Sequence, residues 1–305
     1  MIVRTVIAVL VFCAVSQGAA PTGLLSTVSG DVKIVRAGET TPRPARIADL
    51  ISAGDRVLTG PNSQATFLFC PESRTAKMLA DAEVQFDAAA IQVKKGKLSD
   101  DHKLPSCRLP ANLSLAGASQ VQAGVLRLRG SDLTLLSPSR TNIATLLPHF
   151  RWEPMDGATG YELKVMDREE KILWRQSGSA TDAAYPATAP ALAWDQKYLW
   201  RVSAHDADDT LTDVGSYFQV LPKDQADQVR SSEEGLRALI QANPADNSPM
   251  FLLAFLYEDN GMLDEAARIY GELAKKIGPQ DWVQTQLTGL MNKLGWSKPE
   301  YAIPH

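Results

Sequence analysis

The side chains that could perform acid–base or metal chemistry are spread thinly along this sequence. Its four histidines, His102, His149, His205 and His305, lie far apart, and none stands at the spacing that joins metal ligands in a motif such as H-E-x-x-H. The sequence also lacks a G-x-S-x-G nucleophile motif, a phosphate-binding glycine loop and a dinucleotide fingerprint. We therefore predict a protein that is not an enzyme and that holds neither a metal ion nor a cofactor.

Two charged clusters could bind ions or charged polymers. The stretch H-D-A-D-D-T at residues 205–210, with Asp213 beyond it, could offer oxygen ligands to calcium. Its spacing is not that of an EF-hand, so we favour a solvated hairpin between two strands. Lys94, Lys95 and Lys97 could attract lipid headgroups or a polysaccharide, but lysines around a glycine turn are more typical of a protected sheet edge.

Residues 1–20 are typical of a secretory signal peptide. Arg4 supplies the positive charge, residues 6–15 form a ten-residue apolar run, and small residues including Ala19 and Ala20 follow it. A transmembrane helix needs about 20 apolar residues, so this run is too short to span a bilayer. We expect a cleaved signal, a periplasmic or secreted protein, and no stable membrane span.

Cys70 and Cys107 are the two cysteines that remain once the signal is removed. An even number of cysteines in an exported chain is typical of a disulfide, because the compartment is oxidising. A catalytic or metal-binding thiol would need a partnering histidine or a C-x-x-C spacing, and we find no such motif. We predict a Cys70–Cys107 disulfide.

The composition limits the class of protein. The chain has 305 residues, of which 45% are apolar and 22% charged, as in folded globular proteins, and this length suits two or three domains. Its net charge of −4 comes without a cluster of arginines, whereas a nucleic-acid-binding protein usually carries a basic stripe. We expect no nucleic-acid partner.

Residues 21–137 consist of short runs in which apolar and other side chains alternate, separated by glycine turns. The runs include residues 32–34, 65–69, 84–86, 91–93, 113–115 and 126–128. This pattern predicts an all-β domain. The segment resembles a FecR domain in three runs, which are G-D-V-K-I-V at 30–35, L-I-S-A-G-D-R-V-L-T-G at 50–60 and S-Q-A-T-F-L-F at 63–69.

The resemblance to FecR domains implies a role in the bacterial envelope. FecR-type transducers carry a cytoplasmic segment that contacts a sigma factor, and a membrane helix, ahead of such a domain. In this chain the export signal takes up the residues before the domain, so we expect the domain to serve as an envelope module. The resemblance leaves open a sensory module that binds a cell-wall glycan or an outer-membrane receptor.

Residues 138–222 have the pattern of a compact β-sandwich. Aromatic and apolar side chains recur at every second residue in runs near 150–152, 161–165 and 198–202. Side chains spaced by two share one side of a sheet, and that side is normally buried, so we predict that these aromatics form the core and do not bind glycans. The segment resembles a fibronectin type III or related immunoglobulin-like domain.

Residues 223–305 change to helical periodicity, and the stretch 247–276 resembles one tetratricopeptide repeat. Leu253 and Tyr257 fall on its first helix, Gly261 in its turn and Tyr270 on its second helix. A single repeat is rarely stable alone, so the unit must dock on another chain or cap its own. We predict Met250, Leu253, Tyr257 and Tyr270 as partner-binding residues.

Together these patterns predict a multidomain protein that is mainly β and ends in a short α-helical unit. We expect a non-enzymatic envelope scaffold or adaptor that binds a protein partner through its helices, while the β domains set reach and orientation. The alternatives are the sensory module and a cell-wall hydrolase. We do not favour the hydrolase, because these modules rarely supply the deep pocket that an enzyme needs.

Overall fold

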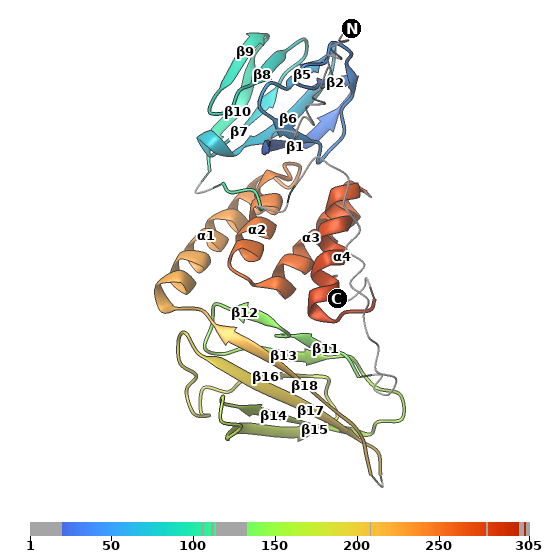
Figure 1. The fold of residues 1–305 in the computed structure, drawn as a ribbon, viewed down its shortest axis with the longest axis vertical. Helices are drawn as coiled ribbons and strands as arrows, with labels where there is room; N and C mark the ends of the chain where they lie inside the picture. Colours follow the sequence, from blue (N-terminus) through green and yellow to red (C-terminus); the bar gives the residue numbers. More distant parts are fainter. Residues whose placement is uncertain are drawn as a thin grey trace, which may run out of the picture.

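The computed structural model describes residues 20–104, 107–110, 113, 133–207, 209–278, 280–298 and 302 (Figure 1). Two β domains lie on either side of four C-terminal helices, which confirms the prediction of a mainly β, multidomain fold that ends in helices. No helix in these residues is both long and apolar enough to cross a membrane. Residues 1–19 of the predicted signal peptide, all but Leu113 of the strand expected at 113–115, and the strand expected at 126–128 lie outside the described residues.

The first β domain, within residues 21–103, consists of short strands in two five-stranded sheets. Its strands are β1 Pro21–Ser29, β2 Val32–Val35, β3 Arg43–Pro44, β4 Leu50–Ser52, β5 Arg56–Thr59, β6 Gln64–Phe69, β7 Arg74–Met78, β8 Glu83–Phe86, β9 Ile91–Lys95 and β10 Leu98–Lys103. One sheet has the strand order β10-β7-β6-β1-β4 and the other β3-β2-β5-β8-β9. Ile34, Phe67 and Phe86 belong to the core that the two sheets enclose.

A turn at Gly54-Asp55 accounts for the Gly-Asp pair in the sequence run 50–60. Gly54 has a φ of +91°, and a Cβ there would lie 2.8 Å from the Ala37 side chain. Asp55 is buried and accepts hydrogen bonds from the backbone N–H groups of Ser52 (3.0 Å) and Ala37 (2.9 Å). The Arg36 guanidinium lies 2.6 Å from the same carboxylate. The Gly-Asp pair therefore joins the ends of β2, β4 and β5.

The second β domain is a sandwich of a three-stranded and a five-stranded sheet, with strand orders β11-β13-β16 and β12-β18-β17-β14-β15. Its strands are β11 Leu135–Ser137, β12 Thr141–Ile143, β13 His149–Trp152, β14 Gly160–Met166, β15 Ile172–Gly178, β16 Asp182–Ala184, β17 Lys197–His205 and β18 Thr210–Val220. Phe150, Trp152, Trp200 and Phe218 are buried between the sheets, which confirms that the alternating aromatics form the core. Strand β11 pairs with β13, so residues 135–137 lie in this sandwich, although the sequence pattern groups them with the preceding domain.

The helices follow the sandwich in the chain and occupy the space between the two β domains (Figure 1). They are α1 Lys223–Ala242, α2 Ser248–Asp259, α3 Leu263–Ile277 and α4 Asp281–Leu294. Gly261 reverses the chain between α2 and α3 with a φ of +67°, where a Cβ would lie 2.7 Å from Nδ2 of Asn142. Helix α2 is apolar over most of its length, and it is buried by α1, α3 and strand β6.

Apolar contacts join the helices to the first β domain. Leu24, Leu50 and Leu68, from strands β1, β4 and β6, share one buried cluster with the helices. Trp282 of α4 packs in the same region and donates a hydrogen bond from Nε1 to the carbonyl oxygen of Ala48 (2.5 Å). The helices therefore shield this face of the β domain from solvent, and their side chains complete its apolar core.

A buried polar network lies beside that apolar contact. Ser248, at the start of α2, is 2.7 Å from Oγ of Ser26 in β1 and 3.1 Å from Oγ1 of Thr75 in β7. Asp246 accepts hydrogen bonds from the hydroxyls of Ser248 (2.7 Å) and Ser26 (3.1 Å), and Asn247 donates to the Ser26 carbonyl (2.8 Å). These directional bonds fix the position of α2 on the first β domain.

A second polar contact joins the helices to the sandwich. Asp264 of α3 is buried and accepts hydrogen bonds from the hydroxyls of Ser137 (2.7 Å) and Thr141 (2.9 Å). The Asn142 backbone donates to the Gly261 carbonyl (2.9 Å), so the α2–α3 turn is bonded directly to strand β12. The helical unit is therefore held on both sides by buried contacts.

Candidate functional site

The four predicted partner-binding residues lie inside the helical unit. Met250, Leu253, Tyr257 and Tyr270 are at most 6% exposed. The hydroxyl of Tyr257 accepts a hydrogen bond from Arg237 (3.1 Å), and that of Tyr270 donates to a carboxylate of α2 (2.9 Å). Burial raises the pKa of both tyrosines. In this fold the chain's own apolar cluster covers these four side chains, so they present no surface to a partner.

The predicted disulfide between Cys70 and Cys107 is confirmed, with the two Cα atoms 4.8 Å apart. It links the short 3-10 helix Cys70–Glu72, which follows β6, to the chain beyond β10. The backbone N–H of Leu104 also donates to the Ser73 carbonyl (2.7 Å), so two bonds hold this segment against the first β domain. The two sulfurs are thus structural.

The described histidines do not converge on a reactive centre. His102 contacts the backbone of its own strand, and His149 lies 2.8 Å from Asp182 with both side chains exposed. His205 lies 3.1 Å from the Thr210 hydroxyl in the hairpin between β17 and β18. Within the described residues no group of three or more His, Cys, Asp or Glu side chains is placed to hold a metal ion. His305 lies outside those residues.

Asp206 and Asp209, from the acidic stretch at 205–210, lie between β17 and β18, as the hairpin interpretation predicts. Asp206 and Asp209 close the turn by two hydrogen bonds, from the Asp209 N–H to the Asp206 carboxylate (2.8 Å) and from the Asp206 N–H to the Asp209 carbonyl (3.1 Å). Asp213 pairs with Arg201 on the neighbouring strand (3.1 Å). These carboxylates therefore already have partners within the hairpin.

The solvent face of the five-stranded sheet carries an ordered arrangement of side chains. Strand register places Tyr217, Leu199, Met166 and Ile172 side by side on β18, β17, β14 and β15, and we call this line the apolar row. These residues are absent from the sandwich core, whose side chains come from the alternate positions. Tyr217 is 49% exposed and Ile172 39%, whereas Leu199 is half-buried and Met166 is 7% exposed, so the row opens apolar surface to water mainly at its two ends.

A line of cations runs beside the apolar row. Arg201, Lys164 and Arg175 are neighbours on β17, β14 and β15, and we call them the basic row. Gly215 takes the corresponding position on β18, where a Cβ would lie 3.2 Å from Cγ of Arg201. The absence of a side chain at Gly215 therefore leaves room for the Arg201 side chain to lie over β18 and bond to Asp213 on that strand.

Two carboxylates, those of Glu162 and Asp213, form the next line along the same strands. Glu162 lies 2.6 Å from Lys164 and 4.0 Å from Arg175. Three cations thus face two anions on this part of the sheet. Arg175, Arg201 and Asp213 are at least 45% exposed, whereas Lys164 and Glu162 are half-buried, and ion pairs this close to solvent contribute about 0–1 kcal/mol. The face keeps a local positive surplus although the whole chain is acidic.

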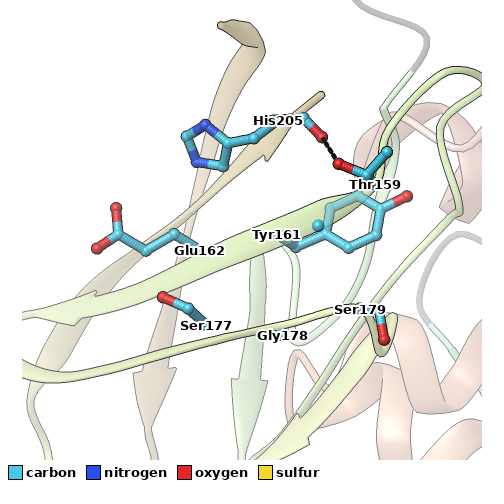
Figure 2. Close-up of a pocket in the computed structure, with 8 residues that line it drawn as sticks. Thr159, Tyr161, Glu162, Ser177, Gly178, Ser179 and His205 are labelled. Atoms are coloured by element: carbon cyan, nitrogen blue, oxygen red, sulfur yellow. Dashed lines mark hydrogen bonds between the residues drawn. The ribbon is translucent and has the colours of Figure 1, made fainter. Parts of the chain in front are cut away.

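A shallow, open hollow of about 470 Å³ lies at the end of this face (Figure 2). It is lined by Thr159, Gly160, Tyr161, Glu162, Ser177, Gly178, Ser179 and His205. The Thr159 hydroxyl donates to the backbone carbonyl of His205 (3.3 Å), so this bond does not pair the hydroxyl with a basic side chain (Figure 2). The hollow therefore offers polar contacts to a ligand.

The sequence matches no family model, and it matches no curated protein. Among solved structures it is similar to CopC from Methylosinus trichosporium OB3b, with 16% identity over 30% of this chain and 94% of that one, at a TM-score of 0.23. It is also similar to the chicken CNTN1 FN1–FN3 domains (12% identity, 65% of this chain and 57% of that one, TM-score 0.20). A third match is a β-glucuronidase from Ruminococcus gnavus (13% identity, 29% of this chain and 15% of that one, TM-score 0.22). At these TM-scores none of the three identifies a shared fold, so the function is argued from the residues of this chain.

Proposed function

We propose that this chain is a non-enzymatic binding protein of the bacterial envelope, a scaffold in which a tetratricopeptide-like helical unit fixes a FecR-like β domain relative to a fibronectin-like sandwich. The observation that carries the proposal is the position of the helices, which bury apolar side chains and hydrogen bonds against the β domains on both sides. Such contacts suit a protein that holds two surfaces at a fixed separation.

This arrangement changes which surfaces are available to a partner. The helical residues expected to bind one are buried, whereas the outer faces of both β domains are open. The β domains therefore become the binding surfaces of the scaffold, and the helices become the connection between them. A purely sensory module would use one β domain alone, so the two functions differ in whether both β domains contact envelope components.

The test is chemical cross-linking with mass spectrometry on the full chain in its native envelope. Partner links are expected from lysines of the two β domains, such as Lys95 and Lys164, while Lys276 on the helices should link within the chain. Partner links confined to the helices would overturn the proposal, and links confined to one β domain would favour the sensory module. Cell fractionation that finds the chain in the cytoplasm would contradict the proposed location.

Deleting the helices is not a clean test of binding. Removing residues 231–305 would uncover Leu24, Leu50 and Leu68, which the helices bury. We expect the truncated chain to lose stability in its first β domain, because apolar area returned to water costs about 25 cal/mol per Å². Loss of binding after that deletion would therefore report unfolding, and point substitutions on exposed faces are the appropriate variants.

A further inference from the structure

The solvent face of the five-stranded sheet has the chemistry of a docking surface for one kind of segment. We propose that the apolar and basic rows together bind an acidic amphipathic helix from a partner protein. This inference rests on the proposed scaffold function and deepens it by naming a face and a partner class.

The dimensions of the apolar row fit a short helix. The row crosses four strands, and adjacent strands lie about 4.8 Å apart, so it is about 14 Å long. A helix rises about 1.5 Å per residue, so roughly ten residues, or nearly three turns, cover that length. Apolar side chains at positions i, i+3, i+4 and i+7 of such a helix would form the stripe that meets Tyr217, Leu199 and Ile172.

The backbone of the sheet favours a helix over an extended segment. Its strands use their N–H and C=O groups in pairing with one another, so the face offers side chains and no backbone hydrogen bonds. An extended peptide lying on that face would leave its own backbone groups without partners, whereas a helix satisfies them internally.

The charges on the face favour acidic side chains in the partner. Arg201, Lys164 and Arg175 lie along one side of the apolar row, and Lys197 projects from β17 on the other side. The basic row lies between the apolar row and the carboxylates of Glu162 and Asp213. Carboxylates that flank the apolar stripe of a bound helix would therefore lie closer to the cations than to these anions. The side chains of Arg175 and Arg201 are at least half exposed and their existing ion pairs are weak, so partner carboxylates can compete for these two arginines.

The same surface is less suited to other ligands. Tyr217 is the single aromatic side chain in the apolar row, whereas binding of sugars or bases by stacking uses platforms of several rings. The hollow at the end of the face is shallow and would bury little of a small molecule. An aliphatic row beside a basic row matches a helix with leucine-like and carboxylate side chains.

The experiment selects peptides from a random 15-residue phage library on the full chain and measures the selected peptides by fluorescence anisotropy. Peptides with apolar residues at helical spacing and flanking Asp or Glu are expected. Tyr217→Ser should weaken their binding about tenfold or more, and Lys164→Gln with Arg201→Gln should do the same while reducing the salt dependence. Circular dichroism checks that each variant is folded.

The matched control lies on the first β domain, where Val93 is 47% exposed beside Lys94 in strand β9. Val93→Ser with Lys94→Gln should leave binding unchanged. Two outcomes would overturn the inference and leave the scaffold function standing. One is selection of peptides without acidic residues. The other is binding that is unchanged by the substitutions on the sheet face and lost in the Val93→Ser, Lys94→Gln control. Binding of phosphatidylglycerol vesicles or polygalacturonate at this face, without enrichment of acidic peptides, would also overturn it. Absence of any envelope cross-link would refute the scaffold function itself.

Discussion

Asp264 offers a direct test of how the helical unit is attached to the sandwich. Its carboxylate is buried at the start of α3 and accepts hydrogen bonds from the hydroxyls of Ser137 and Thr141 and from the backbone N–H of Glu265 (2.9 Å). Burial raises the pKa of Asp264, although the hydrogen bonds from Ser137 and Thr141 oppose that shift. The Asn and Ala variants separate the loss of charge from the loss of hydrogen bonds.

The magnitudes follow from what each variant removes. Asp264→Ala leaves the Ser137 hydroxyl and the Glu265 N–H without their acceptor, and the Thr141 hydroxyl can turn to the Gly261 carbonyl (3.3 Å). We expect a loss of about 2 to 4 kcal/mol in the free energy of unfolding. Asp264→Asn keeps the volume and one oxygen acceptor, and it removes a charge that burial disfavours, so its loss should stay within about 1 kcal/mol.

The pH dependence has a definite sign. A raised pKa means that the folded state holds its proton more tightly than the unfolded state, so the stability from this group is complete below the unfolded pKa of about 3.9. It declines as the pH rises through the folded pKa, by up to about 1.4 kcal/mol per pH unit. Asp264→Asn does not titrate, so the free energy of unfolding of the variant minus that of the native chain should increase with pH.

Urea denaturation of the full chain at pH 5 and pH 8, followed by tryptophan fluorescence, measures these differences. The native chain serves as the reference at each pH, which cancels the titration of other groups, and Glu234→Gln on the exposed side of α1 is the control. If Asp264→Asn destabilises the protein as much as Asp264→Ala at both pH values, the carboxylate acts as a required anion and the reasoning is refuted.

Three further predictions concern stability. Replacing Cys70 and Cys107 by Ser opens a loop of 37 residues, which should lower the free energy of unfolding by about 4 kcal/mol and lower the urea midpoint. A native chain whose urea midpoint does not change when its disulfide is reduced would contradict this prediction. Trp282→Phe removes the hydrogen bond to the Ala48 carbonyl and should lower the free energy of unfolding by about 1 kcal/mol. Trp282→Ala also removes the packed ring and should lower it by about 3 to 5 kcal/mol. Equal losses in the two variants would show that packing of the ring is unimportant there. Gly261→Ala forces a Cβ into a left-handed turn that touches β12 and should lower the melting temperature of the chain, and a neutral effect would mean that the turn relaxes freely.

Much of the fold could be predicted from periodicity and residue counts. The alternation around Trp200 identifies the sandwich core, and the two cysteines that follow the predicted signal peptide identify the disulfide. Periodicity also shows that Leu253 and Tyr257 share a helix, but it does not show what covers that helix. The run from Pro249 to Tyr257 contains no charged residue, and a helix that is apolar all round is normally buried, so this signal was available and points away from a docking surface.

The candidate binding face could not be predicted in the same way. The alternation of Glu162, Lys164 and Met166 is visible in the sequence, but the rows form only when β14 pairs with β17 in one register. A shift of one residue would send the opposite side chains to the surface. Neighbours across strands depend on tertiary structure, which a single sequence without aligned relatives does not reveal.

The contact between Ser26 and Ser248 also has a consequence for the order in which the protein folds. These residues touch although 222 positions separate them, so during synthesis β1 exists long before its partner on α2. Until the helices arrive, Leu24, Leu50 and Leu68 have no cover, and a long loop must close before they gain it. We therefore expect docking of the helices to be the late, slow step of folding, and the period before it to be when the chain is most open to aggregation and proteolysis.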